Sequence, residues 1–133
     1  MAEDSGLEIE ALDGAPGIFS ARFSRQQTDE KNIQKVLRLM RGTPAAARRA
    51  RFVCSMVLAR NGRAVKTVTG RVRGDILFEK KGSLGFGYDP IFFYKPLGRT
   101  FAELKPGEKN AVSHRGRALK KIKAFLKEYL RRA

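Results

Sequence analysis

Alternation between apolar and polar positions predicts four strands in this chain. Residues 7–12, LEIEAL, alternate apolar with acidic side chains, a pattern typical of a half-buried strand. Residues 51–60 and 64–74 are rich in β-branched side chains, and the Asn-Gly dipeptide at 61–62 between them is a strong hairpin signal. The apolar run IFFY at 91–94 indicates a further buried strand.

Two other segments carry apolar residues at helical spacing. Residues 28–42 form one apolar face, with Thr28 as a candidate N-cap and Gly42 as a candidate terminator. From Ser113 onward a second helix is largely Lys and Arg outside one apolar stripe. The stripe consists of Leu119, Ile122, Phe125, Leu126, Tyr129 and Leu130. The order of elements predicts one α/β domain with a mixed, partly antiparallel sheet.

Length and cysteine content narrow the class of protein. A chain of 133 residues, 42% of them hydrophobic, fits one compact domain. No apolar run approaches membrane-spanning length and no signal-peptide pattern follows Met1, so we expect a cytoplasmic protein with no membrane partner. The single cysteine, Cys54, excludes an intramolecular disulfide, and its apolar neighbours favour a buried thiol in a strand.

The net charge of +15 favours polyanionic partners such as nucleotides or nucleic acid. The basic residues are spread along the chain rather than gathered in one block. We therefore expect most of them to form a solvated surface. Direct nucleic-acid binding is the less favoured interpretation, but it stays open.

The tetrapeptide EDSG at residues 3–6 is the first group of residues with possible chemistry. Glu3 and Asp4 are adjacent carboxylates, and Mg²⁺ prefers such oxygen ligands. Asp4 could also accept a proton from an attacking water. The alternative is an ordinary turn or helix cap.

The segment GSLGFGYDP at residues 82–90 is a glycine-rich loop with two aromatic residues. Its glycines would let the backbone approach a ligand closely. Phe86 and Tyr88 offer ring faces to a planar base, and Asp89 could accept hydrogen bonds from the edge of that base. The alternative is a glycine-rich turn with core aromatics, and the P-loop pattern is absent.

The segment KNAVSHR at residues 109–115 predicts an anion site at a helix start. With Ser113 as N-cap, His114 and Arg115 fall in the first turn, where the helix dipole favours negative charge. Lys109, which we expect on the incoming loop, can reach the same point. A capped surface helix is the alternative.

Taken in order, four segments of the chain resemble the non-canonical purine nucleoside triphosphate pyrophosphatases, the inosine/xanthosine triphosphate (XTP/dITP) diphosphatases. The segments are EDSGLEIEALDGAPGIFSARFS, RFVC, GFGYDPIF and FAELKPGEKNAVSHRGRAL. The resemblance implies Mg²⁺-dependent hydrolysis of ITP, dITP and XTP to the monophosphate and pyrophosphate, which cleanses the nucleotide pool. It also implies a homodimer and an elongated mixed sheet flanked by helices, in two lobes with the active site between them.

The same resemblance implies roles for individual residues. The family's general base and metal-binding aspartate falls on Asp4, and its substrate-contacting serine falls on Ser5. The other substrate contacts that it implies are Phe86, Gly87, Tyr88, Asp89, Lys109, His114 and Arg115. A hydrogen-bond donor from His114 or Arg115 would favour binding of a 6-oxo purine, whereas adenine would leave that donor unpaired.

The chain departs from the family pattern at its beginning. The family's Thr/Ser-x-Asn-x-x-Lys motif, which binds the triphosphate, and a following helix with a metal-associated glutamate are not found in residues 1–133. We therefore expect a single, N-terminally truncated domain that lacks the first strand and helix, with impaired activity. The alternatives are an assembly completed by another polypeptide or a symmetry mate, and a catalytically inactive basic module that binds nucleotides or nucleic acid.

Overall fold

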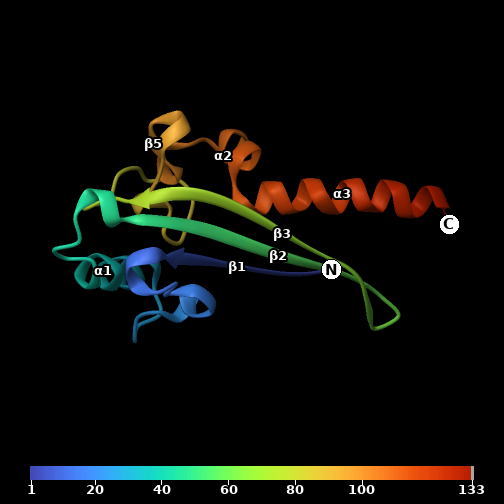
Figure 1. Cartoon of the computed structure of the whole chain (residues 1–133), viewed down its shortest axis with the longest axis horizontal. Helices are drawn as coiled ribbons and strands as arrows, with labels where there is room; N and C mark the ends of the chain where they lie inside the picture. Colours follow the sequence, from blue (N-terminus) through green and yellow to red (C-terminus); the bar gives the residue numbers. More distant parts are fainter. Residues whose placement is uncertain (133) are drawn as a thin grey trace.

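A five-stranded sheet in the order β1-β2-β3-β4-β5 organises the computed structural model, which describes residues 1–132 (Figure 1). The strands are β1 (Ala2–Ile9), β2 (Arg49–Arg60), β3 (Arg63–Ile76), β4 (Phe92–Tyr94) and β5 (Arg99–Thr100). The sheet flanked by helices confirms the α/β class. Its four strand pairings are all antiparallel, whereas we expected a mixed sheet. Each connection joins two neighbouring strands at the same end of the sheet, so the second strand runs opposite to the first.

The long β2–β3 hairpin has the turn that its sequence predicts. Asn61 and Gly62 have φ values of 53° and 76°, the left-handed conformation that a two-residue type I′ turn requires at both positions. The strand expected at residues 7–12 is shifted. β1 starts at Ala2 and ends at Ile9, and residues 10–12 form a single 3₁₀ turn.

Three α-helices accompany the sheet. They are α1 (Asp29–Leu39), α2 (Pro106–Val112) and α3 (His114–Arg132). Thr28 caps α1, since its Oγ1 accepts the Lys31 N–H at 3.2 Å. Ser113 caps α3 in the same way, because its Oγ accepts the Gly116 N–H at 3.0 Å. Both predicted N-caps are confirmed.

Short 3₁₀ turns complete the chain. They are η1 (Glu10–Leu12), η2 (Gly17–Arg22), η3 (Ala45–Ala47), η4 (Asp89–Ile91), η5 (Lys95–Leu97) and η6 (Phe101–Glu103). Within residues 1–132, none of the helices combines the length and the apolar character that crossing a membrane requires.

One face of the sheet carries two buried clusters, because strand residues alternate between faces. At one end α1 packs Ile33, Val36 and Met40 into a cluster with Leu7 and Ile9 of β1. At the other end α3 covers a second cluster, which consists of Cys54, Met56, Val68, Ala118 and Ile122. The buried Cys54 confirms the prediction for the single thiol.

Helix α3 is held on the hairpin near both of its ends. At its start, a Cβ on Gly70 of β3 would lie 2.1 Å from the His114 carbonyl oxygen, so only glycine allows this approach. Near its end, Arg60 Nη1 donates a hydrogen bond to the Tyr129 hydroxyl at 3.2 Å. The first residues of α3 therefore have a fixed place over the sheet.

We predict that Gly70→Ala lowers the free energy of unfolding by about 1–3 kcal/mol, because the added methyl forces α3 away from β3. Urea unfolding followed by circular dichroism measures this change. Gly107→Ala is the matched control, since nothing lies within 4 Å of its Cβ position. If both variants unfold at the wild-type midpoint, the close approach of α3 to β3 is wrong.

Candidate functional site

The loop at residues 82–90 has a conformation that depends on its glycines. Gly85 and Gly87 have φ values of +75° and +61°, and a Cβ on Gly85 would lie 2.2 Å from Asp89 Oδ2. The same Asp89 oxygen accepts the Phe86 N–H at 3.1 Å. The loop is therefore closed around the carboxylate of Asp89, and it turns the Phe86 ring outward.

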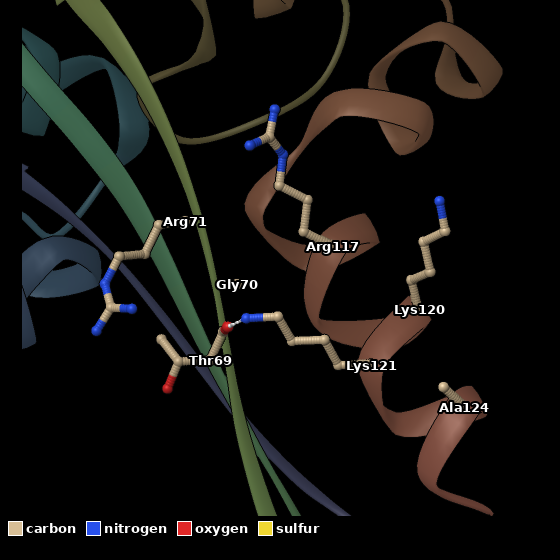
Figure 2. A pocket seen from close by; sticks show the side chains of 7 residues that line it. All are labelled: Thr69, Gly70, Arg71, Arg117, Lys120, Lys121 and Ala124. Carbon is tan, nitrogen blue, oxygen red and sulfur yellow. Dashed lines mark hydrogen bonds between the residues drawn. The ribbon is translucent and has the colours of Figure 1, made fainter.

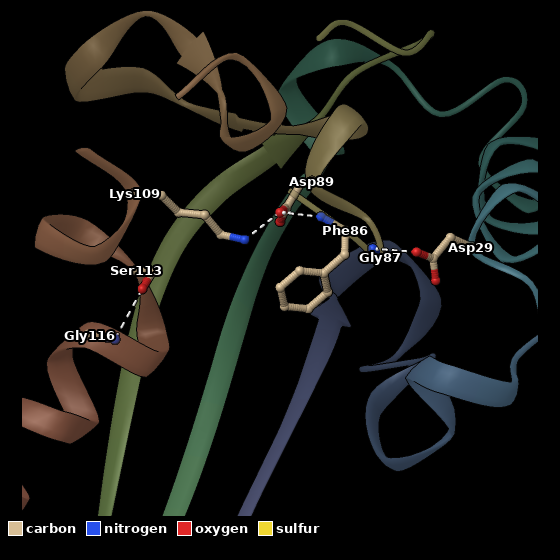
Figure 3. Close-up of polar contacts among 7 residues, drawn as sticks. All are labelled: Asp29, Phe86, Gly87, Asp89, Lys109, Ser113 and Gly116. Atoms are coloured by element: carbon tan, nitrogen blue, oxygen red, sulfur yellow. Dashed lines mark hydrogen bonds and ion pairs between the residues drawn. The ribbon is translucent and has the colours of Figure 1, made fainter. Parts of the chain in front are cut away.

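Lys109 of α2 meets this loop through a buried ion pair. Its Nζ lies 2.5 Å from Asp89 Oδ2, and the two side chains are 14% and 4% exposed (Figure 3). The same ammonium group lies 4.3 Å from the centre of the Phe86 ring. Burial raises the pKa of Asp89, and the ion pair with Lys109 partly offsets this rise. The structure thus brings Phe86, Asp89 and Lys109 together.

The two aromatic residues of the loop differ in exposure. The Phe86 ring is 73% exposed, whereas Tyr88 is 5% exposed and belongs to the main core. The Tyr88 hydroxyl donates to the Ser20 carbonyl oxygen at 2.6 Å, and burial raises its pKa. Of the two rings that the sequence offered to a planar base, only that of Phe86 has an open face.

Asp29 also belongs to this cluster, although no sequence pattern pointed to a functional role for it. Its Oδ2 accepts the Gly87 N–H at 2.9 Å (Figure 3). Asp29 is the first residue of α1, and acidic residues are common in a first helical turn for reasons of the helix dipole. The sequence contains no other signal that would have connected it to a loop 58 positions away.

His114 lies at the start of α3, beside the same cluster. Its ring stacks on Phe52 of β2, with centres 4.7 Å apart and planes 18° apart. Burial, together with the charges of Lys109 and Arg115, lowers the pKa of His114 to about 4. The imidazole is therefore neutral near pH 7, and its buried Nδ1 has no hydrogen-bond partner within residues 1–132.

Arg115 reaches across to β1. Its Nε lies 2.8 Å from Glu3 Oε1. Glu3 and Ser5 face Met56 and Cys54, which α3 covers, so alternation along β1 places the intervening Asp4 on the opposite face of the sheet.

The paired-carboxylate interpretation of EDSG is therefore wrong, because Glu3 and Asp4 point to different faces of β1. Asp4 and Ser5 are exposed. No hydrogen bond or ion pair within residues 1–132 joins Asp4 to Lys109 or His114. In the same part of the chain, no three His, Cys, Asp or Glu side chains form a group that could hold a metal ion. The convergence of Asp4 on the cluster stays a prediction.

A groove between β3 and α3 is concave and strongly basic. Its lining residues are Thr69, Gly70, Arg71, Arg117, Lys120, Lys121 and Ala124. Lys121 crosses the groove and donates to the Thr69 carbonyl oxygen at 2.5 Å. Figure 2 shows Arg71 and Lys120 extending to opposite sides, so the cations do not converge on one point. This arrangement fits the solvated basic surface expected from the sequence better than it fits a small anion site.

Known proteins are similar to this chain in both sequence and fold. The model of the Ham1 family matches residues 1–125. A protein of Exiguobacterium sibiricum named dITP/XTP pyrophosphatase is 50% identical over 131 residues, which are 98% of this chain and 66% of that protein. A Bacillus subtilis protein of the same name is 47% identical over 127 residues, 95% of this chain and 64% of that protein.

A solved structure gives the same result for the fold. The Ham1 protein of Staphylococcus aureus superimposes with a TM-score of 0.89 at 42% identity, covering 96% of this chain and 66% of that one. The chain thus spans about two thirds of the length of the relatives that it matches. The resemblance seen in the sequence is confirmed.

We predict that the buried His114 makes the protein less stable as the pH falls. The unfolded chain takes up a proton near the ordinary histidine pKa of 6.5, whereas the folded protein resists protonation until about 4. Unfolding is therefore favoured progressively across that interval, by on the order of 3 kcal/mol in total.

Urea unfolding at several pH values, compared between the wild type and His114→Phe, measures this effect. Phenylalanine keeps a ring against Phe52 but has no proton to gain, so the variant should lose less stability on acidification. Equal losses in both proteins would show that His114 is not the group responsible.

Proposed function

This chain belongs to the Ham1 family, and from that premise we propose that it binds and hydrolyses non-canonical purine nucleoside triphosphates. The expected reaction converts dITP, ITP or XTP to the monophosphate and pyrophosphate. The observation that carries the proposal is the cluster of Phe86, Asp89 and Lys109 beside the start of α3. The names of the Exiguobacterium and Bacillus relatives support the same substrate class.

The exposed ring of Phe86 is suited to stack on a purine base. One cation, Lys109, already lies at this ring and is neutralised in part by Asp89. In the proposed complex Asp89 and Tyr88 hold the loop rather than touch the base directly, because both side chains are buried. Gly87 gives the base an approach free of any side chain, since nothing lies within 4 Å of its Cβ position.

Discrimination between hypoxanthine and adenine requires a donor for the 6-oxo group. A neutral His114 can donate one hydrogen bond. Arg115 donates its Nε–H to Glu3, and its other guanidinium N–H groups are further possible donors. A 6-oxo purine pairs with such a donor, whereas adenine presents an amino group and leaves it unpaired. Both residues belong to the proposal as candidate donors.

Cleavage of the α–β anhydride depends mainly on charge neutralisation and on an oriented water. In this proposal the fixed positive charge comes from Lys109 and Arg115, which Asp89 and Glu3 neutralise in part. Asp4, an exposed residue on the other face of β1, is assigned to orient and deprotonate the water. A bound Mg²⁺ would neutralise phosphate charge, and a single carboxylate suits it because Mg²⁺ usually keeps water and phosphate oxygens as its other ligands. Asp4 is the residue of this chain that we assign to it. The proposal includes a homodimer that acts in the cytoplasm.

The direct test is pyrophosphate release from dITP in the presence of Mg²⁺, with dATP as the matched substrate. We predict that dITP is the preferred substrate and that Asp4→Asn lowers turnover by about 10²- to 10⁴-fold, the usual range for losing a general base. Circular dichroism should show an unchanged fold, because Asp4 is exposed. Equal turnover of dITP and dATP would contradict the proposed substrate class, and normal turnover by the variant would remove Asp4 from catalysis.

We also predict that Phe86→Ala raises KM for dITP by about tenfold or more with a smaller change in kcat. Stacking of a base on an aromatic ring contributes about 1–3 kcal/mol, and it acts equally on substrate and transition state. Steady-state kinetics separates the two parameters. Phe78→Ala is the control, because Phe78 is also exposed and also lies against a cation, Arg48. An unchanged KM in the Phe86 variant would rule out stacking.

A further inference from the structure

Two neighbouring backbone amides of the loop at residues 82–90 are held by two different aspartates. The Phe86 N–H donates to Asp89, which belongs to the loop itself. The Gly87 N–H donates to Asp29 Oδ2 at 2.9 Å, and Asp29 belongs to helix α1 (Figure 3). The peptide before Phe86 is thus held by a residue of the loop, and the peptide after it is held by a residue of α1.

Helix α1 is itself held firmly where Asp29 begins it. Asn32, one turn further on, is buried, and its Oδ1 accepts the Ser24 N–H at 2.7 Å. Its Nδ2 donates to the carbonyl oxygens of Ser20 and Ala21 at 3.3 and 3.2 Å. The Ser20 carbonyl oxygen also accepts the hydroxyl of Tyr88. Asn32 of α1 and Tyr88 of the loop therefore donate hydrogen bonds to the same carbonyl oxygen of η2, that of Ser20.

The Phe86 ring has little else to fix its direction. It is exposed, and the contact that orients it is the one with the ammonium group of Lys109. Gly87 adds backbone freedom, since its φ of +61° is open to glycine and strained for other residues. A hydrogen bond at the Gly87 N–H removes much of that freedom.

We propose that Asp29 is a positioning residue for purine recognition, which fixes the Gly87 peptide and thereby the direction of the Phe86 ring. This inference rests on the proposed function and assigns a role to a residue outside the loop. Asp29 does not touch the base. It acts through the backbone of Gly87, and its effect falls on substrate binding rather than on the chemical step.

Three variants separate the hydrogen bond from the charge. Asp29→Ala removes both, and we expect it to raise KM for dITP by on the order of tenfold with kcat within about twofold, the scale of one charge-assisted hydrogen bond. Asp29→Asn keeps an acceptor oxygen at the same place and should restore most of the wild-type KM. Glu30→Gln is the matched control, because it neutralises a charge in the same helical turn, at a residue paired with Lys80.

Exchange of the Gly87 amide hydrogen, followed by NMR, gives a readout that needs no catalysis. In Asp29→Ala we expect this amide to exchange at least tenfold faster, while the Lys31 amide, which Thr28 caps, keeps its rate. In Asp29→Asn the Gly87 rate should stay near that of the wild type.

The outcomes keep the two proposals apart. A wild-type protein that does not prefer dITP contradicts the proposed function, whatever the exchange rates are. A dITP-specific wild type whose Asp29→Ala variant keeps its KM and its Gly87 exchange rate overturns the inference about Asp29. An Asp29→Asn variant as impaired as Asp29→Ala also overturns it, because the charge and not the hydrogen bond would then matter.

Discussion

The buried ion pair between Asp89 and Lys109 is the interaction on which the candidate site depends. It joins the glycine-rich loop to α2, and α2 leads directly into α3 with His114 and Arg115. A buried charge without its partner is costly, so each of the two residues holds the other in place. The same carboxylate closes the loop on the Phe86 amide. The loop and the helix start therefore form one unit, although they are far apart in the sequence.

Signals that act over a few residues could be predicted from the sequence. The Asn-Gly turn at 61–62 and the caps Thr28 and Ser113 are of this kind, because the residue that gives the signal also makes the local hydrogen bond or backbone angle. The interpretation of EDSG as a pair of carboxylates in one site was wrong because no local signal showed that this segment is a strand. Two adjacent carboxylates suggest one site only if the backbone turns there, and β1 already runs through Glu3 and Asp4.

Contacts between distant residues could not be predicted in this way. Arg115 and Glu3 are 112 positions apart, and Asp29 and Gly87 are 58 apart, so no local spacing connects them. Composition and family resemblance both point to the loop at 82–90 as part of the site, and that assignment stays a prediction. Hydrophobicity alone would favour burying Phe86 rather than Tyr88. The structure shows the reverse, because Tyr88 packs against η2 and its hydroxyl donates to the Ser20 carbonyl oxygen there.

The attachment of α3 to the hairpin at two distant points has a mechanical consequence. Gly70 fixes the beginning of the helix, and Arg60 holds Tyr129 near its end. Helix α3 and the hairpin are therefore joined at both ends of the helix. A molecule bound at the hairpin tip, at residues 60–63, would thus contact the same hairpin on which the first turn of α3, with His114 and Arg115, is seated.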